Sequence, residues 1–445
     1  MRVLKAGNRF GVVLVVLAGV AAVVAASGHP TANVDRADRS APRPVVNDTD
    51  QLIWTYQERI KDFPDDVASY AILGAAYLQR ARETGDPAYY RKAEAVLDEA
   101  LKRDPQHVEA LIGMGTLALA RHQFRDALAL GEQARSINPT IPRIYGVIAD
   151  AQIELGLYAE AVQSIQTMVD MRPDLSSYSR VSYARELHGD VEGAIAAMQS
   201  AVTAGGPTAE NTNWTRVQLG HLFLNQGDWV SAETTYRQAL AAQPGYVHAE
   251  AGLARIYAAR REFDQAVQLY TEVVQRMPLA EYVIALGEVY EASGRHAEAQ
   301  SQFDLVHAIE QLNAANGVDT DLEMVLFTAD HLQDQSAEEA LARARRAYDK
   351  RPTLYAADAL AWTLYRAGRY SEAYAWSQRA LRLGTQDALL FFHAGMIARE
   401  TGRIGEARAY LRRALRINPD FSLRYRDVAR DTLSALDRRA IMNGR

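Results

Sequence analysis

Three acidic residues at alternating positions are the strongest candidate for a metal site in the sequence. Asp319, Asp321 and Glu323 have the spacing with which a calcium loop presents its first ligands. A calcium loop also needs a Gly at its sharp turn and a closing bidentate Glu, and neither stands at its place. We therefore interpret Asp319 or Asp321 as the N-cap of a helix, where a carboxylate accepts from the first backbone amides.

Other residue types that carry chemistry are scattered or absent. The 10 His residues occur singly, and His188 and His221 fall in different segments of the chain, which argues against a metal site. The sequence has no Cys, so disulfides, thiol catalysis and zinc sites built on thiolates are excluded. It also lacks a GxxxxGK[ST] phosphate loop, HExxH, GxSxG and a kinase signature. We predict a protein that is not an enzyme, with no catalytic residues, cofactor or metal.

The composition is that of an ordinary folded protein. The 445 residues are 48% hydrophobic and 23% charged, and the formal net charge is -6. This charge gives no footprint for nucleic acid, so we expect no nucleic-acid partner. Basic residues are nearly all Arg and Ala is abundant, which is typical of GC-rich bacterial genomes.

The N-terminus has the pattern of an export signal. Arg2, Lys5 and Arg9 precede an uncharged apolar run at residues 10–26. Residues 1–27 are therefore predicted to be a cleaved signal peptide or an uncleaved membrane anchor, two alternatives that the run's length leaves open. The Pro-containing segment 28–48 is expected to be a flexible linker. In both cases the rest of the chain is predicted to lie outside the cytoplasm, in the periplasm, at the cell surface or secreted.

The remaining chain repeats itself. Pro105, Pro139 and Pro173 are spaced by 34 residues, and small and aromatic residues recur at matching offsets before each of them. This period is typical of stacked helical hairpins, in which Gly and Ala permit close helix packing and Pro ends the unit.

The clearest copy of the repeat runs from Leu219 to Pro244 and resembles the tetratricopeptide repeat (TPR) family. The positions that carry the resemblance are Leu219, Gly220, Phe223, Ala232, Tyr236 and Pro244. The resemblance implies an all-α, right-handed superhelix of antiparallel helix pairs, with about ten repeats over 49–420. Residues 421–445 are expected to form a capping helix and tail, and each repeat to contact mainly its neighbours.

The TPR resemblance also implies that the first helices of successive repeats line a concave groove that holds a segment of a partner. Helical spacing assigns candidate side chains to this groove: Tyr183, Trp214, His221, Arg255, Tyr355, Trp362, Tyr365, Phe392 and Met396. The aromatic residues of the last two repeats have two interpretations. They form an exposed anchor patch, or they pack between repeats or under the tail residues Leu423, Val428, Leu433 and Leu436.

The groove departs from two known kinds of TPR groove. Lys is nearly absent, so the Lys and Asn set that clamps a terminal carboxylate in some TPR adaptors is missing. The asparagine ladder of O-GlcNAc transferase repeats is also missing, because its places hold Gly113, Val147, Arg180, Gln218 and Gly252. We predict a scaffold that binds a protein or peptide segment. The alternative is a regulatory subunit of a glycosyltransferase-like or envelope polysaccharide or peptidoglycan assembly system.

Overall fold

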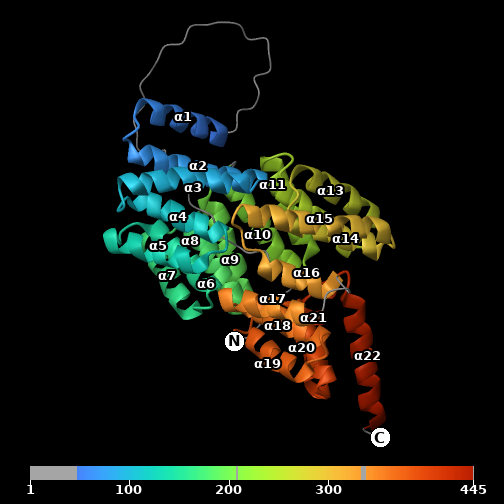
Figure 1. Cartoon of the computed structure of the whole chain (residues 1–445). Helices are drawn as coiled ribbons and strands as arrows, with labels where there is room; N and C mark the ends of the chain where they lie inside the picture. The colour runs from blue at the N-terminus through green and yellow to red at the C-terminus, as the bar shows by residue number, and fades with distance from the viewer. Residues whose placement is uncertain (1–47, 207–208, 332–336, 444–445) are drawn as a thin grey trace.

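The computed structural model describes residues 48–206, 209–331 and 337–443, and every regular element in these ranges is an α-helix. The predicted export segment, nearly all of the linker and Pro207 of the connection before the fifth repeat lie outside the described residues. None of the helices in the described ranges is long and apolar enough to cross a membrane. The predicted all-α repeat superhelix is confirmed (Figure 1).

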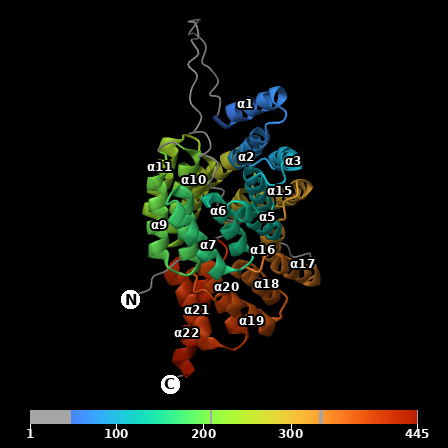
Figure 2. The ribbon, with the colours of Figure 1, turned by 90° about the vertical axis from the view of Figure 1, so that its left-hand side faces the viewer.

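Ten helix pairs follow a single N-terminal helix, α1 (Asp48–Asp62), and precede a C-terminal helix, α22 (Arg426–Asn443). The pairs are α2 (Val67–Thr84) and α3 (Ala88–Arg103), α4 (Val108–Ala120) and α5 (Phe124–Ile137), α6 (Pro142–Glu154) and α7 (Tyr158–Met171), α8 (Leu175–Leu187) and α9 (Val191–Ala204), α10 (Glu210–Asn225) and α11 (Trp229–Ala242), α12 (Val247–Ala259) and α13 (Phe263–Arg276), α14 (Ala280–Ala292) and α15 (His296–Ala315), α16 (Asp321–His331) and α17 (Ala337–Lys350), α18 (Leu354–Arg366) and α19 (Tyr370–Ala380), and α20 (Ala388–Glu400) and α21 (Ile404–Ile417). In Figures 1 and 2, α1 and α22 lie at opposite ends of the array.

Glycine notches filled by an aromatic side chain hold neighbouring repeats together. The fully buried ring of Tyr236 on α11 lies against Gly220 of its own repeat and Gly252 of the next. A Cβ added at Gly220 or Gly252 would lie 2.3 or 2.6 Å from that ring. No larger residue fits there, which is why Gly recurs with the period of the repeat.

The superhelix turns tightly enough for its successive turns to touch. The backbone amide of Leu354 donates to the Tyr158 hydroxyl at 2.9 Å, across 196 residues of sequence. Asn418 Nδ2 donates to the carbonyl of Leu224 at 3.1 Å, across 194 residues, and the hydroxyl of Thr385 donates to the carbonyl of Leu187. We call this line of contacts the seam. It joins the hairpin turns that follow α4, α6, α8, α10 and α12 to the loops before α16, α18 and α20 and to the segment after α21.

A buried ion pair lies at the middle of the seam. The guanidinium of Arg351 pairs with Glu154 from the other turn of the superhelix and with Glu323 at 3.1 Å. Arg351 and Glu154 are both buried. Removing one partner of a buried pair typically costs about 3–5 kcal/mol, because the remaining charge is left uncompensated. The expectation that each repeat contacts mainly its neighbours is therefore incomplete.

Two glycines bring the backbones of the two turns together. Gly156 and Gly189 adopt positive φ values of 70° and 78°, and each follows the first helix of its repeat. A Cβ at Gly156 would lie 2.5 Å from the carbonyl oxygen of Pro352, and a Cβ at Gly189 would lie 2.4 Å from that of Gly384. His122 occupies the same turn position in the second repeat with a φ of 60°, and its Nδ1 lies 2.5 Å from the carbonyl oxygen of Asp319.

The aromatic residues of the last two repeats are buried, which corrects their assignment to an exposed groove. Trp362 is only 2% exposed, Phe392 and Met396 are also buried, and Tyr365 is partly buried and stacks on Trp362. Residues that follow α21 cover them: Phe421 and Tyr425 pack on Phe392. Of the tail residues predicted to provide this cover, Leu436 is buried in the same cluster, whereas Val428 is exposed and Leu423 packs on another part of the core.

Tyr183 and Tyr355 also differ from the groove assignment. Tyr183 is buried, and Tyr355 is partly buried and packs on the cluster that contains it. That cluster lies where α6 and α8 meet α18 across the seam. Both side chains were predicted to face the groove because helical spacing identifies a second face of each helix. The seam fills that face with the other turn of the superhelix.

Changing Gly156 to Ala tests whether the seam contributes to stability. The matched control is Gly368→Ala, because Gly368 has a φ of 75° at the same turn position and nothing lies within 4 Å of an added Cβ. Both variants should lose about 1–2 kcal/mol from the left-handed conformation. Gly156→Ala should lose about 1–3 kcal/mol more, because its Cβ clashes with Pro352. Chemical denaturation measures the difference, and equal losses would show that the seam adds no stability.

Changing Trp362 to Ala tests the burial of the aromatic cluster. The change should lower the free energy of unfolding by about 3–5 kcal/mol, as large-to-small substitutions in cores do. Trp54 on α1 is 63% exposed, and Trp54→Ala should change stability by less than about 0.5 kcal/mol. Thermal and urea unfolding followed by circular dichroism compare the two. A Trp362→Ala protein as stable as wild type would restore the exposed-patch interpretation.

Candidate functional site

A cavity of about 480 Å³ lies inside the superhelix. Its wall is formed mainly by α10, α12, α14 and α16, together with the segment after α21. This volume falls in the range of small-molecule and side-chain binding pockets, about 300–1,000 Å³. Among the predicted groove residues, Trp214, His221 and Arg255 line the cavity, whereas Tyr183, Tyr355, Trp362, Tyr365, Phe392 and Met396 do not.

The repeat period explains why these helices present their side chains to one space. Trp214, His248 and Tyr282 stand 34 residues apart in three successive first helices, and all three line the cavity. Gln218 and Gly252 form a second row at the same period. Residues 214, 218 and 221 of α10 lie one turn apart on a single face, because positions i, i+4 and i+7 share a face of a helix.

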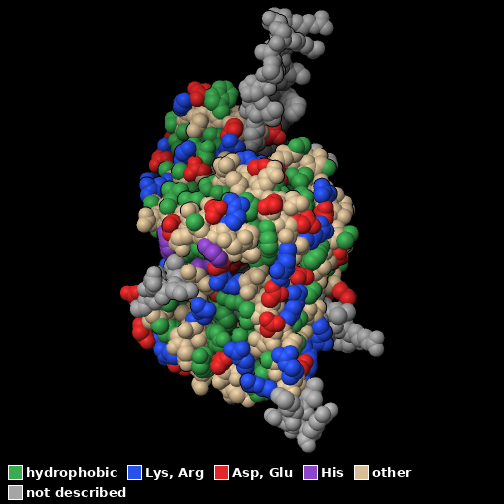
Figure 3. Space-filling model, turned by 90° about the vertical axis from the view of Figure 1, so that its right-hand side faces the viewer, with side chains coloured by type: hydrophobic (Ala, Val, Ile, Leu, Met, Phe, Trp, Pro, Cys, Tyr) green, Lys and Arg blue, Asp and Glu red, His purple; other side chains and the backbone are tan. Residues whose placement is uncertain are grey.

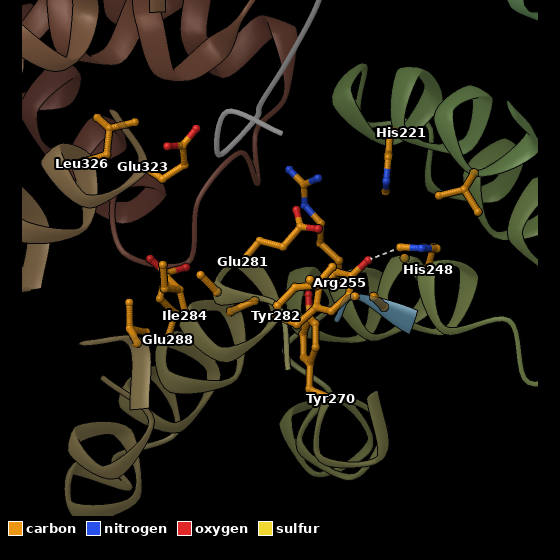
Figure 4. A pocket seen from close by; sticks show the side chains of 18 of the residues that line it. His221, His248, Arg255, Tyr270, Glu281, Tyr282, Ile284, Glu288, Glu323 and Leu326 are labelled. Carbon is orange, nitrogen blue, oxygen red and sulfur yellow. Dashed lines mark hydrogen bonds between the residues drawn. The ribbon is translucent and has the colours of Figure 1, made fainter. Parts of the chain in front are cut away.

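Hydrogen bonds hold two histidines at the cavity wall. His221 Nδ1 lies 2.7 Å from the hydroxyl of Tyr236, the ring that fills the glycine notches. The Tyr282 hydroxyl donates to His248 Nδ1 at 2.5 Å (Figure 4). Burial lowers the pKa of His248 to about 4, since desolvation disfavours the charged imidazolium. His248 is therefore neutral at pH 7 and acts as a hydrogen-bond acceptor.

Acidic side chains enter the cavity from α14 and α16. Figure 4 shows Glu281 next to Arg255 near the middle of the space, with Glu288 and Glu323 further along the wall. Asp330 also lines the cavity, where its Oδ1 accepts from Trp362 Nε1 at 2.7 Å and from the Tyr425 hydroxyl at 2.5 Å. The floor of the cavity is thus joined to the buried aromatic cluster.

Three polar atoms at the cavity wall have no hydrogen-bond partner within the protein. They are Gln218 Oε1, Glu323 Oε2 and Trp229 Nε1. Gln218 is only 3% exposed, so its carbonyl oxygen is not solvated in the ordinary way. Buried polar groups are rarely left unpaired, and each such group calls for an explanation. Here the two acceptors and the donor border the same space.

The sequence-based assignment found only part of this site. Gln218 was noted for what it is not, a ladder asparagine, and Glu281, Glu288, Glu323 and Asp330 were not singled out for the groove. A signal was present, because Gln218 and Gly252 share the repeat register with the predicted His221 and Arg255. The acidic triplet 319–323 supports the N-cap interpretation, since Asp319 Oδ1 accepts from the backbone amide of Asp321 at 3.0 Å. Over the described ranges, no group of three or more His, Cys, Asp or Glu side chains is placed to hold a metal ion.

The surface outside the cavity has no strong field of one sign. On the face in Figure 3, Lys and Arg side chains are interspersed with Asp and Glu. Many exposed arginines pair with a neighbouring acid on the same helix, such as Arg237 with Glu233 and Arg369 with Glu372. Such exposed pairs are worth about 0–1 kcal/mol each and mark a solvated face rather than a binding site.

Comparisons with known proteins agree with the repeat architecture. Family models described as tetratricopeptide repeats match residues 89–142, 118–183, 223–283 and 388–421. Similar curated proteins include mouse tetratricopeptide repeat protein 21B, 24% identical over 218 residues, covering 44% of this chain and 16% of that protein. Bovine intraflagellar transport protein 70A is 25% identical over 191 residues, covering 42% and 29%. Cellulose synthase operon protein C of Pseudomonas fluorescens (strain SBW25) is 25% identical over 202 residues, covering 43% and 16%. The chain thus spans less than a third of the length of these relatives.

Similar solved structures are also helical repeat proteins at low identity. The human IFIT1 dimer with PPP-AAAA matches with a TM-score of 0.46 and 14% identity, over 82% of this chain and 88% of that one. The APC/C hetero-tetramer Cut9-Hcn1 matches with a TM-score of 0.44 and 15% identity, over 86% and 81%. The matches to the repeat models, the curated relatives and the ten observed helix pairs together lead to one conclusion: this chain belongs to the tetratricopeptide repeat family.

Proposed function

We propose that this protein is a non-enzymatic scaffold that holds a segment of a partner protein in the cavity of its superhelix. The observation that carries the proposal is the cavity wall formed by the first helices of successive repeats, with aromatic side chains and unpaired polar atoms facing one space. Trp and Tyr side chains are typical anchors of protein interfaces. A polypeptide offers the carbonyl and amide groups that Trp229 Nε1 and Gln218 Oε1 lack.

The array is proposed to act outside the cytoplasm. The support comes from the sequence of the first 27 residues, in which Arg2, Lys5 and Arg9 precede the apolar run 10–26. If that run remains uncleaved, it would tether the array to the membrane. The partner would then be a protein or peptide of the cell envelope.

A second candidate is a subunit of an envelope polysaccharide assembly system. The similarity to cellulose synthase operon protein C favours it, since that protein's name links it to polysaccharide synthesis. The similarity covers 16% of that protein, so this chain would share a TPR module with it rather than its whole organisation. Under this proposal the cavity would hold a segment of a synthase or export component.

Site-specific photo-crosslinking tests the scaffold proposal. A photo-reactive phenylalanine analogue at position 214, inside the cavity, should form adducts with one partner in intact cells. The control carries the same analogue in place of Val230, which is 73% exposed on α11 and does not line the cavity. Mass spectrometry identifies the adducts. A partner that crosslinks at position 230 and never at 214 would place the binding surface elsewhere.

Changing Trp214 to Ala should weaken the complex with that partner by about 2 kcal/mol, roughly 30-fold in Kd, as loss of an interface anchor does. Trp54→Ala, outside the cavity, should leave the Kd unchanged. Calorimetry with the purified partner measures both values, and circular dichroism checks that Trp214→Ala remains folded. An unchanged Kd for Trp214→Ala would contradict a cavity-bound anchor.

A topology reporter tests the proposed location. Alkaline phosphatase, which is active only after export, is fused after residue 445 of the full chain. The fusion should be active, while a reporter that works only in the cytoplasm should be silent. Changing Arg2, Lys5 and Arg9 to Glu should reduce phosphatase activity, because the positive charges orient the apolar run. The reverse reporter pattern would place the array in the cytoplasm.

A further inference from the structure

We infer that the partner segment held in the cavity is basic, and that a Lys or Arg side chain of that segment occupies the acidic wall formed by Glu288, Glu323 and Asp330. This inference rests on the proposed function, because the partner segment carries the cation.

The charges at the cavity wall are unbalanced. Six acidic residues line the cavity against two arginines. The acidic residues are Glu281, Glu288, Glu310, Glu323, Asp330 and Asp420, and the arginines are Arg82 and Arg255. Arg82 is already paired with Glu210, which lies outside the lining, and Arg255 lies beside Glu281 in Figure 4.

Pairing with residues behind the wall neutralises some of these acids. Glu310 pairs with Arg343, and Asp420 pairs with Arg426 and Arg430. The neutralised acids therefore belong to the structure of the array and not to a binding site.

Three acids are left with incomplete compensation. Glu323 pairs with Arg351 through Oε1, and its Oε2 has no partner. The hydrogen bonds described for Asp330 come from the neutral Trp362 and Tyr425. These acids lie on α16, and Glu288 of α14 completes the wall.

Glu288 faces a histidine that hydrogen-bond geometry keeps neutral. His331 Nε2 lies 3.4 Å from Glu288 Oε1. The other ring nitrogen, Nδ1, lies 2.7 Å from Arg424 Nη2. A guanidinium can only donate, so Nδ1 must accept and the ring carries its single proton on Nε2. Glu288 thus has a neutral donor at a long distance and no full positive charge of its own.

An independent observation points to a donor-rich ligand. Gln218 Oε1, on a side chain that is 97% buried, borders the cavity with no hydrogen-bond partner. Together with Glu323 Oε2 it gives the wall two unused acceptors. A guanidinium has five N–H donors and an ammonium has three, so a basic side chain satisfies several acceptors at once.

The remaining unpaired atom favours a peptide over a free polyamine. Trp229 Nε1 is a donor and borders the same cavity. A polyamine at neutral pH offers no acceptor for it, whereas a peptide supplies backbone carbonyls. Tyr270 and Tyr282, which lie beside Arg255 and Glu281 in Figure 4, add aromatic faces of the kind that attract organic cations.

Binding of short labelled peptides to the full-length protein tests the inference. The probe is a fluorescein-labelled Gly/Ser peptide of ten residues with two Lys. The matched peptides have both Lys acetylated or both replaced by Glu. Fluorescence anisotropy should show the Lys peptide binding at least tenfold more tightly than either, with an affinity that falls as salt rises. Equal binding of the acetylated peptide, or no binding of the Lys peptide, would overturn the inference.

Two variants locate the effect. Glu288→Gln keeps the shape of the side chain and removes its charge, and it should weaken the Lys peptide about tenfold or more. Glu160→Gln, on the exposed face of α7 and outside the cavity, should bind like wild type. An equal response of the two variants would overturn the inference, because the effect would then come from overall charge. Circular dichroism confirms that both variants are folded.

Spermine distinguishes the two sources of a cation. If the site is built for a peptide, spermine should displace the Lys peptide only at much higher concentration than the unlabelled peptide does. Displacement by spermine at equal or lower concentration would assign the site to a free polyamine and overturn the inference. The crosslinked partner separates this result from the proposed function. If it binds Glu288→Gln as tightly as wild type, the scaffold stands and the basic segment fails; if it never crosslinks at position 214, the scaffold itself fails.

Discussion

The contact between successive turns of the superhelix is the constraint on which the rest of this structure depends. In a helical-repeat array, local packing sets only a small rotation from one repeat to the next. Here those rotations add up so that Arg351 meets Glu154 and the backbone of Gly156 meets that of Pro352. The seam therefore fixes the curvature of the whole array. It also determines which side chains face the interior space and which are buried by the opposite turn.

The cavity follows from this constraint. Along the seam, the concave faces of α6 and α8 are covered by α18, and their aromatic residues become core. Further along, α10, α12 and α14 have no such cover over their inner faces, and the space between them and α16 remains open as the cavity. The same family of concave side chains thus has two roles. The segment after α21 closes one end, where Tyr425 bonds to Asp330 at the cavity wall.

The sequence predicted the contacts that recur with the repeat and missed those that do not. Gly220 and Tyr236 could be assigned because their packing involves neighbouring repeats and returns every 34 residues. Trp214, His221 and Arg255 could be placed on the inner face by helical spacing alone. Trp362 could not, because spacing identifies a face of a helix and not what covers it. The acids of α14 and α16 resemble solvated residues of amphipathic helices, and only the closed superhelix brings them around one space.

The separation of the seam partners in sequence has a consequence for how the chain acquires its structure. Each helix pair can form from contacts within a few tens of residues, so the early repeats are able to fold while later ones are still being made. The seam joins residues 194 to 198 positions apart and requires a large loop to close. Closure must therefore come last, after the ninth and tenth repeats exist. Until then the inner surface is open to solvent along its length, and a partner present at that stage would meet the site before it is enclosed.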